Sequence, residues 1–181
     1  MPGRSDPRDV LPDVLPDVLG PGLTLVLCGT QAGAASARLG AYYAGPGNRF
    51  WGTLHATGLT PRRLAPQEFR ALPDYGIGLT DVAKRSSGPD AALRGDHFDA
   101  DGLAARIRAH APAILAFNGK RAAQAVLRPR GRALAYGLQP DTLGTTRLVV
   151  LPSTSGAASG FWSIEPWRAL AALVKETSSP R

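Results

Sequence analysis

The sequence predicts an α/β protein, built as a three-layer α/β/α sandwich around a short, mainly parallel sheet of four to five strands. Apolar runs of strand length alternate along the chain with segments of helical periodicity. The 181 residues are 44% hydrophobic and only 19% charged, which is enough to form one substantial core. Strands separated by helices favour a parallel sheet between two helical layers.

Four apolar runs predict strands at 23–28, 77–80, 113–117 and 148–151. Segments of helical period predict helices at 48–57, 66–72, 100–110, 120–127 and 165–175. In the last helix, Leu170, Leu173 and Val174 share one face. No linker interrupts 23–178, so we expect a single domain over residues 20–178.

The amino-terminal region carries the repeat DVLP, DVLP, DVLG over residues 9–20. A proline at every fourth position forbids a regular helix, and the aspartates favour solvation. We therefore expect residues 1–19 to form a flexible, acidic, proline-containing tail.

The charge of the chain is basic, with a formal net value of +7. The expected tail carries two arginines against four aspartates, which leaves +9 on the remainder. Such a charge favours a polyanionic partner, for example nucleic acid. The alternative is compositional, because 18 of the 21 basic residues are arginine, as a GC-rich genome would favour.

Several site classes are disfavoured by the cysteine and histidine content. Cys28 is the single cysteine and follows an apolar run, so we expect a buried thiol, no internal disulfide and no four-cysteine metal site. His55, His97 and His110 lack paired spacing, and we expect no metal and no cofactor. No signal peptide or membrane segment is evident, so we expect a cytoplasmic protein without a membrane partner.

Three loops are expected to meet at one edge of the sheet, because parallel strands end at the same side. The first loop contains Gln31, the second contains Asp81 directly after an apolar run, and the third spans 152–160 with small hydroxyl and backbone donors. Serine and glycine also fill ordinary turns, which is the structural alternative for the third loop. Their convergence predicts a ligand site at this edge.

These loops carry a family resemblance. GTQAG at 29–33, GPGNRFW at 45–51, the Leu79-Thr80-Asp81 loop, GKRA at 119–122 and LPSTSGAASG at 151–160 resemble the successive motifs of mismatch-specific uracil and thymine DNA glycosylases, within the uracil-DNA glycosylase superfamily. The likeness covers about 17–176. It implies that superfamily's fold and a monofunctional glycosylase of base-excision repair, which flips a uracil or related mispaired or damaged pyrimidine out of DNA and hydrolyses its N-glycosidic bond. The expected substrates are G:U or G:T mismatched duplexes, or single-stranded DNA. We accordingly expect a monomer of bacterial type that is associated with the nucleoid through DNA binding.

The resemblance also implies a base pocket. Tyr43 matches the aromatic residue on which the base stacks, and Gly33 matches a small residue that leaves room at the pyrimidine 5-position. Gly29, Thr30 and Ser153 are expected to line the same pocket. The structural alternative for Gly33 is a turn glycine. The neighbouring Tyr42 is expected to face outward or to pack against the core.

Catalysis is assigned to two residues. Gln31 stands where the family commonly has a water-positioning asparagine; its carbonyl can orient water, but the amide cannot act as a base. Asp81 is therefore our main catalytic candidate, able to polarise water and stabilise an oxocarbenium-like sugar. Its alternative role is a helix N-cap. Other candidate carboxylates lie in a polar stretch that we interpret as solvated loop: Asp90, Asp96, Asp99 and Asp101.

DNA contacts are expected from the third loop and from nearby cations. The loop matches the family segment that enters the duplex, but its residues are small and include no Arg or Leu wedge: Ser155, Gly156, Ala157, Ala158 and Ser159. Phe161 or Trp162 could supply an apolar wedge, although Trp162 also suits helix packing. Phosphate contacts are expected from Lys84, Arg85 and Lys120, and a basic run follows at Arg128, Arg130 and Arg132. Asn48 and Arg49 are expected to cap and brace a helix that buries Phe50 and Trp51.

Two other functions compete with a glycosylase. The first is a non-catalytic relative that binds damaged DNA through the same pocket, which the glutamine at position 31 and the small third loop favour. The second is a nucleotide-binding or hydrolytic Rossmann-type enzyme. It is disfavoured because GTQAG is not GxGxxG, no Walker lysine follows and no GxSxG motif occurs.

Overall fold

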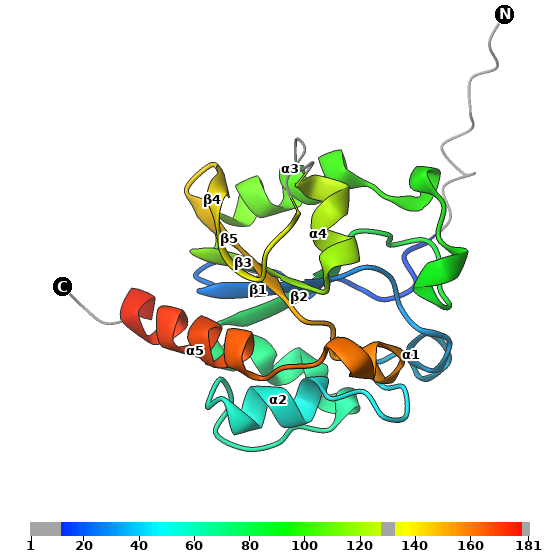
Figure 1. Cartoon of the computed structure of the whole chain (residues 1–181), viewed down its shortest axis with the longest axis horizontal. Coiled ribbons are helices and arrows are strands. Elements are labelled where there is room, and N and C mark those ends of the chain that lie inside the picture. The colour runs from blue at the N-terminus through cyan, green and yellow to red at the C-terminus, as the bar shows by residue number, and fades with distance from the viewer. Residues whose placement is uncertain (1–11, 128–132, 179–181) are drawn as a thin grey trace, which may run out of the picture.

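The protein is described by a computed structural model over residues 12–127 and 133–178. A five-stranded sheet with the order β2-β1-β3-β5-β4 forms its centre (Figure 1). Four strands are parallel, and β4 pairs antiparallel with β5 at one edge. The predicted α/β sandwich with a mainly parallel sheet is therefore confirmed. The strands are β1 (Leu25–Gly29), β2 (Ile77–Asp81), β3 (Ile114–Asn118), β4 (Gly137–Leu143) and β5 (Thr146–Leu151).

Helices cover both faces of the sheet, as Figure 1 shows. Side chains alternate along β1: Leu25 and Leu27 belong to the apolar cluster that includes Trp167, whereas Val26 and Cys28 belong to the cluster on the other face. The α-helices are α1 (Ala34–Leu39), α2 (Phe50–Ala56), α3 (Ala100–His110), α4 (Lys120–Val126) and α5 (Glu165–Ser178). The 3-10 helices are η2 (Pro66–Tyr75), η3 (Asp90–Ala92), η4 (Gly95–His97) and η5 (Gly156–Phe161).

One α-helix and one strand lie outside the predicted set, as do the short 3-10 helices η3, η4 and η5, and one predicted helix differs in type. Helix α1 is short, and β4 is an edge strand whose side chains are mostly exposed or half-buried, so neither has a strong apolar pattern. The predicted helix at 66–72 is a longer 3-10 helix, η2, with Pro73 inside it. Proline lacks the N–H that an α-helix would need at that position.

The prediction of a flexible tail over 1–19 is wrong for the part that the structure describes, residues 12–19. This segment, which we call the strap, lies against the sheet: Leu15 is 2% exposed and Val18 forms an antiparallel bridge with Leu79. Proline spacing excludes a helix, but it permits an extended segment that buries Leu15 and Val18. Residues 1–11 lie outside the described part.

Membrane-spanning helices and metal sites were sought only among the described residues, 12–127 and 133–178. No helix within them has the length and apolar character needed to span a bilayer. No three His, Cys, Asp or Glu side chains within them are grouped as a metal site. Cys28 is a fully buried free thiol, as predicted.

Candidate active site

A cavity of about 800 Å³ opens at the carboxyl edge of the sheet, where the loops after β1, β2, β3 and β5 meet. The convergence of the three predicted loops is thus observed, and the loop after β3 joins them. Most of the predicted site residues line this cavity: Gly29, Thr30, Gln31, Gly33, Tyr43, Asp81, Lys120, Ser153, Ser155, Gly156, Ala157 and Ala158. Three do not: Lys84, Arg85 and Ser159.

Asp81 is the last residue of β2 and is only 4% exposed. Its carboxylate lies over the end of β1, because a Cβ atom built on Gly29 would be 2.5 Å from Oδ1 of Asp81 and 3.0 Å from Oη of Tyr43. The alternative role as a helix N-cap does not apply, since residues 82–89 contain no helix. The structure therefore brings a buried carboxylate and an aromatic hydroxyl together at the cavity wall.

The environment of Asp81 changes its acidity. Burial raises the pKa of the carboxyl group from 3.8 to about 7, because removal from water disfavours the charged form. Lys84 and Arg106 act in the opposite direction, whereas the anions Asp17 and Asp90 add to the increase. Asp81 can therefore exchange a proton near neutral pH.

Tyr43 is held in a defined position. Its backbone has a φ of 52°, which is uncommon for a residue other than glycine. Its ring stacks on Phe50, with ring centroids 3.9 Å apart and planes 24° apart. The hydroxyl oxygen is buried and has no hydrogen-bond partner among the described residues. Tyr42, in contrast, is buried in the core and donates to the carbonyl of Pro16.

Gln31 is anchored through its amide nitrogen. Nε2 donates to the carbonyl oxygens of Gly88 (2.9 Å) and Pro89 (3.1 Å), and so it fixes the loop that follows β2. The amide oxygen Oε1 is buried and lacks a hydrogen-bond partner in the described structure. Its acceptor capacity remains available for a water molecule.

The expected phosphate contact of Lys84 is corrected by the structure. Lys84 is 7% exposed, and its Nζ lies 2.8 Å from Oδ1 of Asp17 and donates to the carbonyl of Leu15. A single buried cation is stable only when it is paired, and the strap supplies the partner. Lys84 therefore faces the back of the site and not the DNA side.

The other predicted cations lie differently. Arg85 is exposed but does not line the cavity. Lys120 begins α4 at the cavity, with its Nζ 4.5 Å from the ring centre of Tyr136. The basic run at 128–132 lies outside the described residues.

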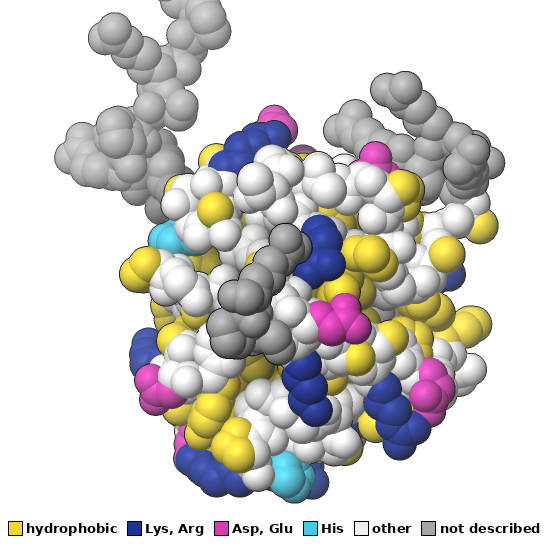
Figure 2. Space-filling view, turned by 90° about the vertical axis from the view of Figure 1, so that its left-hand side faces the viewer, with side chains coloured by type: hydrophobic (Ala, Val, Ile, Leu, Met, Phe, Trp, Pro, Cys, Tyr) yellow, Lys and Arg dark blue, Asp and Glu magenta, His cyan; other side chains and the backbone are white. Residues whose placement is uncertain are grey.

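The face drawn in Figure 2 lies at the amino ends of the parallel strands. Lys and Arg side chains lie singly on this face, with Asp and Glu side chains among them.

Asn118 is a polar cavity residue that the sequence analysis did not single out. Asn118 ends β3 and lines the cavity; its Nδ2 donates to Oγ1 of Thr154, and its Oδ1 accepts from the Thr154 backbone N–H. The carbonyl of Thr154 in turn accepts from the N–H of Arg49. These bonds tie the loop after β5 to β3 and α2. The available signal was a polar residue directly after an apolar strand, the pattern that marked Asp81.

The two aromatic residues after this loop differ in exposure. Phe161 is 79% exposed at the end of η5, whereas Trp162 packs against the core beneath the guanidinium of Arg49. Asn48 accepts from the N–H of Phe50, as a capping residue does. Phe161 is thus the one of the two whose ring is exposed.

The competing carboxylates are mostly remote. Asp90 lines the cavity, but Asp96, Asp99 and Asp101 do not. Asp99 caps α3 by accepting from the N–H of Gly102. Of the predicted catalytic carboxylates, Asp81 is the buried one at the cavity.

Comparisons with known proteins agree with this arrangement. The family model of the Uracil DNA glycosylase superfamily matches residues 16–171. Among solved structures, the chain is similar to the solution NMR structure of a proposed uracil DNA glycosylase from Methanosarcina acetivorans. The TM-score is 0.63 at 24% sequence identity, over 91% of this chain and 97% of that chain. This structural likeness supports a common fold.

Proposed function

The chain belongs to the uracil DNA glycosylase superfamily, and on that premise we propose that it is a monofunctional DNA glycosylase of base-excision repair. Its substrate would be uracil, or a related mispaired or damaged pyrimidine, in DNA. The observation that carries the proposal is the buried carboxylate of Asp81 at the cavity wall, beside the hydroxyl of Tyr43. A flipped base needs an enclosed pocket with an aromatic wall, and hydrolysis needs a group that activates water.

In the proposed reaction, the oxygen of a water molecule bonds to C1′ of the deoxyribose while the bond from C1′ to the base nitrogen breaks. The electron pair of that bond leaves with the base, and Asp81 accepts the proton from water. The carboxylate also opposes the positive charge that develops on the sugar. A pKa of about 7 suits a general base, because the ionised form is populated near neutral pH.

Water, and not an amine, is the proposed nucleophile. The chain has three lysines, all within the described ranges. Lys84 is paired with Asp17, and Lys175 lies in the last turn of α5. Lys120 lines the cavity, but its amine lies over the ring of Tyr136. This placement supports hydrolysis over Schiff-base chemistry.

The pocket has features that favour pyrimidines with a substituent at the 5-position. A side chain on Gly33 would meet no atom within 4 Å, so space is open at this part of the cavity wall. The small residues of the third loop offer little to fill the gap left by a flipped base. Bases that unpair easily, in mismatches or single strands, are therefore the proposed substrates.

The test is an excision assay on oligonucleotides that carry uracil opposite guanine, thymine opposite guanine, or uracil in a single strand. Alkaline treatment after incubation cleaves the strand where a base has been lost. We expect cleavage at uracil in the wild type and its loss in Asp81→Asn. Intact strands with all three substrates would contradict the proposal.

A second candidate is a damage-binding protein that does not excise the base. It is favoured by the two hydrogen bonds that commit the amide nitrogen of Gln31 to the carbonyls of Gly88 and Pro89. Preferential binding of mismatched DNA, without strand cleavage after alkali, would identify this function.

A further inference from the structure

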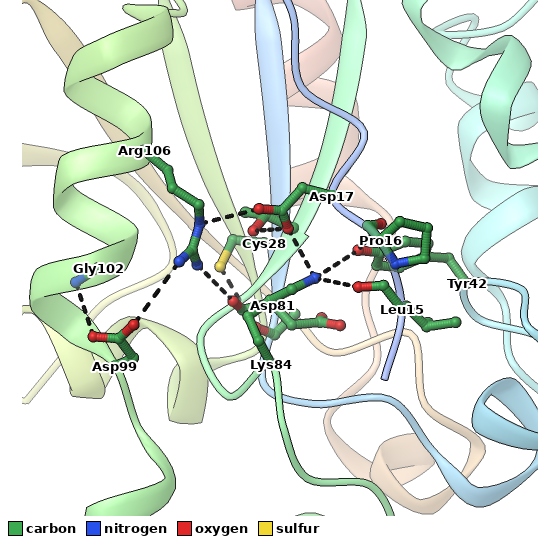
Figure 3. Close-up of polar contacts among 12 residues, drawn as sticks. Leu15, Pro16, Asp17, Cys28, Tyr42, Asp81, Lys84, Asp99, Gly102 and Arg106 are labelled. Carbon is green, nitrogen blue, oxygen red and sulfur yellow. Dashed lines mark hydrogen bonds and ion pairs between the residues drawn. The ribbon is translucent and has the colours of Figure 1, made fainter. Parts of the chain in front are cut away.

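A partly buried cluster of charges joins the strap to the strand that carries Asp81 (Figure 3). Asp17 is its centre: Oδ1 lies 2.8 Å from Nζ of Lys84 and accepts from Oγ1 of Thr80 at 2.7 Å. Its other oxygen, Oδ2, lies 3.2 Å from Nε of Arg106 on α3. One carboxylate therefore contacts two cations and a hydroxyl.

The partners of Asp17 surround Asp81 along the chain. Thr80 precedes Asp81 and Lys84 follows three residues later, while Nη2 of Arg106 donates to the backbone carbonyl of Asp81 at 3.1 Å. A displacement of Asp17 would thus change the contacts of residues on both sides of Asp81 and of the cation that binds its backbone carbonyl.

The strap holds Asp17 in place through its backbone. Val18 and Leu79 exchange two hydrogen bonds of 2.9 Å, and the N–H of Val14 donates to the carbonyl of Lys84. The amine of Lys84 also donates to the carbonyl of Leu15. These bonds lie on both sides of Asp17 and set the position of its carboxylate.

We propose that Asp17 is a positioning residue for Asp81: by pairing with Lys84 and Arg106, it fixes these cations behind the reacting carboxylate and sets how strongly they act on it. The inference rests on the proposed function, in which Asp81 must be ionised to accept a proton from water.

The direction of the effect follows from the charges. Lys84 and Arg106 favour the ionised form of Asp81, and the anion Asp17 disfavours it, which agrees with the directions of their effects on the pKa of Asp81. Several titratable or charged groups are near Asp81 in addition to the strap: Lys84 and Asp90 from its own loop, Arg106 from α3, Cys28 from β1, and Tyr42 and Tyr43 from the segment after α1.

The test is the pH dependence of single-turnover excision on a uracil oligonucleotide. We expect Asp17→Asn to move the acidic limb to lower pH, by about half a unit or more, because an anion near Asp81 has been removed. Lys84→Gln is expected to move the same limb to higher pH. Opposite shifts would not arise from a purely structural role, which would lower the rate equally at all pH values.

Asp13→Asn is the matched control. Asp13 occupies the same position in the preceding DVLP repeat, but its side chain is exposed. We expect its profile to coincide with that of the wild type. Arg106→Gln provides a further variant: it should move the limb in the direction of Lys84→Gln, and it still tests the proposal if the asparagine variant does not fold.

Carbon NMR of labelled aspartate provides a readout that needs no excision. The Asp81 resonance, assigned by its loss in Asp81→Asn, should titrate at lower pH in Asp17→Asn and at higher pH in Lys84→Gln. If the wild type excises no base, the proposed function fails while this titration still measures the coupling. If the titration of Asp81 is the same in all variants, the inference is overturned.

Discussion

The last residue of β1, Gly29, leaves the space in which the carboxylate of Asp81 lies. The two residues are register partners at the ends of adjacent strands, and a Cβ atom on Gly29 would be 2.5 Å from Oδ1 of Asp81. That distance is shorter than a carbon atom and an oxygen atom can tolerate without movement. Gly29 therefore contributes to the site because it has no side chain.

Gly29→Ala should displace the carboxylate of Asp81 and lower the single-turnover excision rate by about 10- to 100-fold, because small misplacements of a reacting group are costly. Gly95→Ala is the matched control, since a Cβ atom there meets nothing within 4 Å and the residue does not line the cavity. Melting temperatures of both variants show whether the fold is retained. Equal excision rates for the two would contradict the close approach.

Asp81→Asn should lower excision by about 10²- to 10⁴-fold, because the amide cannot accept a proton from water. DNA affinity should change little, since the substitution removes a buried carboxylate and no phosphate contact. Binding is measured by fluorescence anisotropy and excision under single-turnover conditions. Asp96→Asn, at an exposed site outside the cavity, is the control. Undiminished excision would exclude Asp81 from the reaction.

The same substitution should stabilise the fold at neutral to alkaline pH. The folded pKa of Asp81 is raised to about 7, above its unfolded value, so the folded state resists ionisation of this group. Its contribution to stability is intact below about pH 4 and is lost as the pH rises through 7. We expect the free energy of unfolding of Asp81→Asn to exceed that of the wild type by about 2–4 kcal/mol at pH 8, and to equal it at pH 4. Urea unfolding at both pH values measures this difference, and an equal gain at both would disprove the assignment.

Lys120→Ala should weaken DNA binding for all sequences alike and reduce the slope of log affinity against log salt by about one unit. Lys120 combines an ammonium group with the start of α4 at the cavity. Arg108→Ala, in the last turn of α3 and outside the cavity, is the control. A salt slope that stays the same in Lys120→Ala would exclude a phosphate contact.

The sequence predicted the sheet well where burial is complete. Strands β1, β2 and β3 are buried at every position, so their apolar runs stand out from the rest of the chain. Strand β4 has one neighbour and carries Gln139, Pro140 and Asp141, so its composition is that of a loop. Edge strands need no apolar pattern because water covers part of their surface.

The site could be predicted in place but not in full detail. Parallel topology brings strand ends together, which made Asp81 a candidate. Sequence alone does not give the direction of a long side chain, and so Lys84 was assigned to DNA although it faces Asp17. The strap was missed for a related reason: its aspartates indicate solvation unless the distant cations that pair with Asp17, namely Lys84 and Arg106, are known.

The strap also has a consequence for the order in which the chain reaches its folded state during synthesis. It emerges from the ribosome before any residue of the sheet, yet its partners include Leu79 and Arg106. Domains fold as units, and so we expect the strap to dock only after α3 has emerged from the ribosome. Its proline spacing prevents a helix and its aspartates oppose collapse, so the strap can stay extended until the sheet has formed. The strap is thus translated before the sheet but reaches its final position after it.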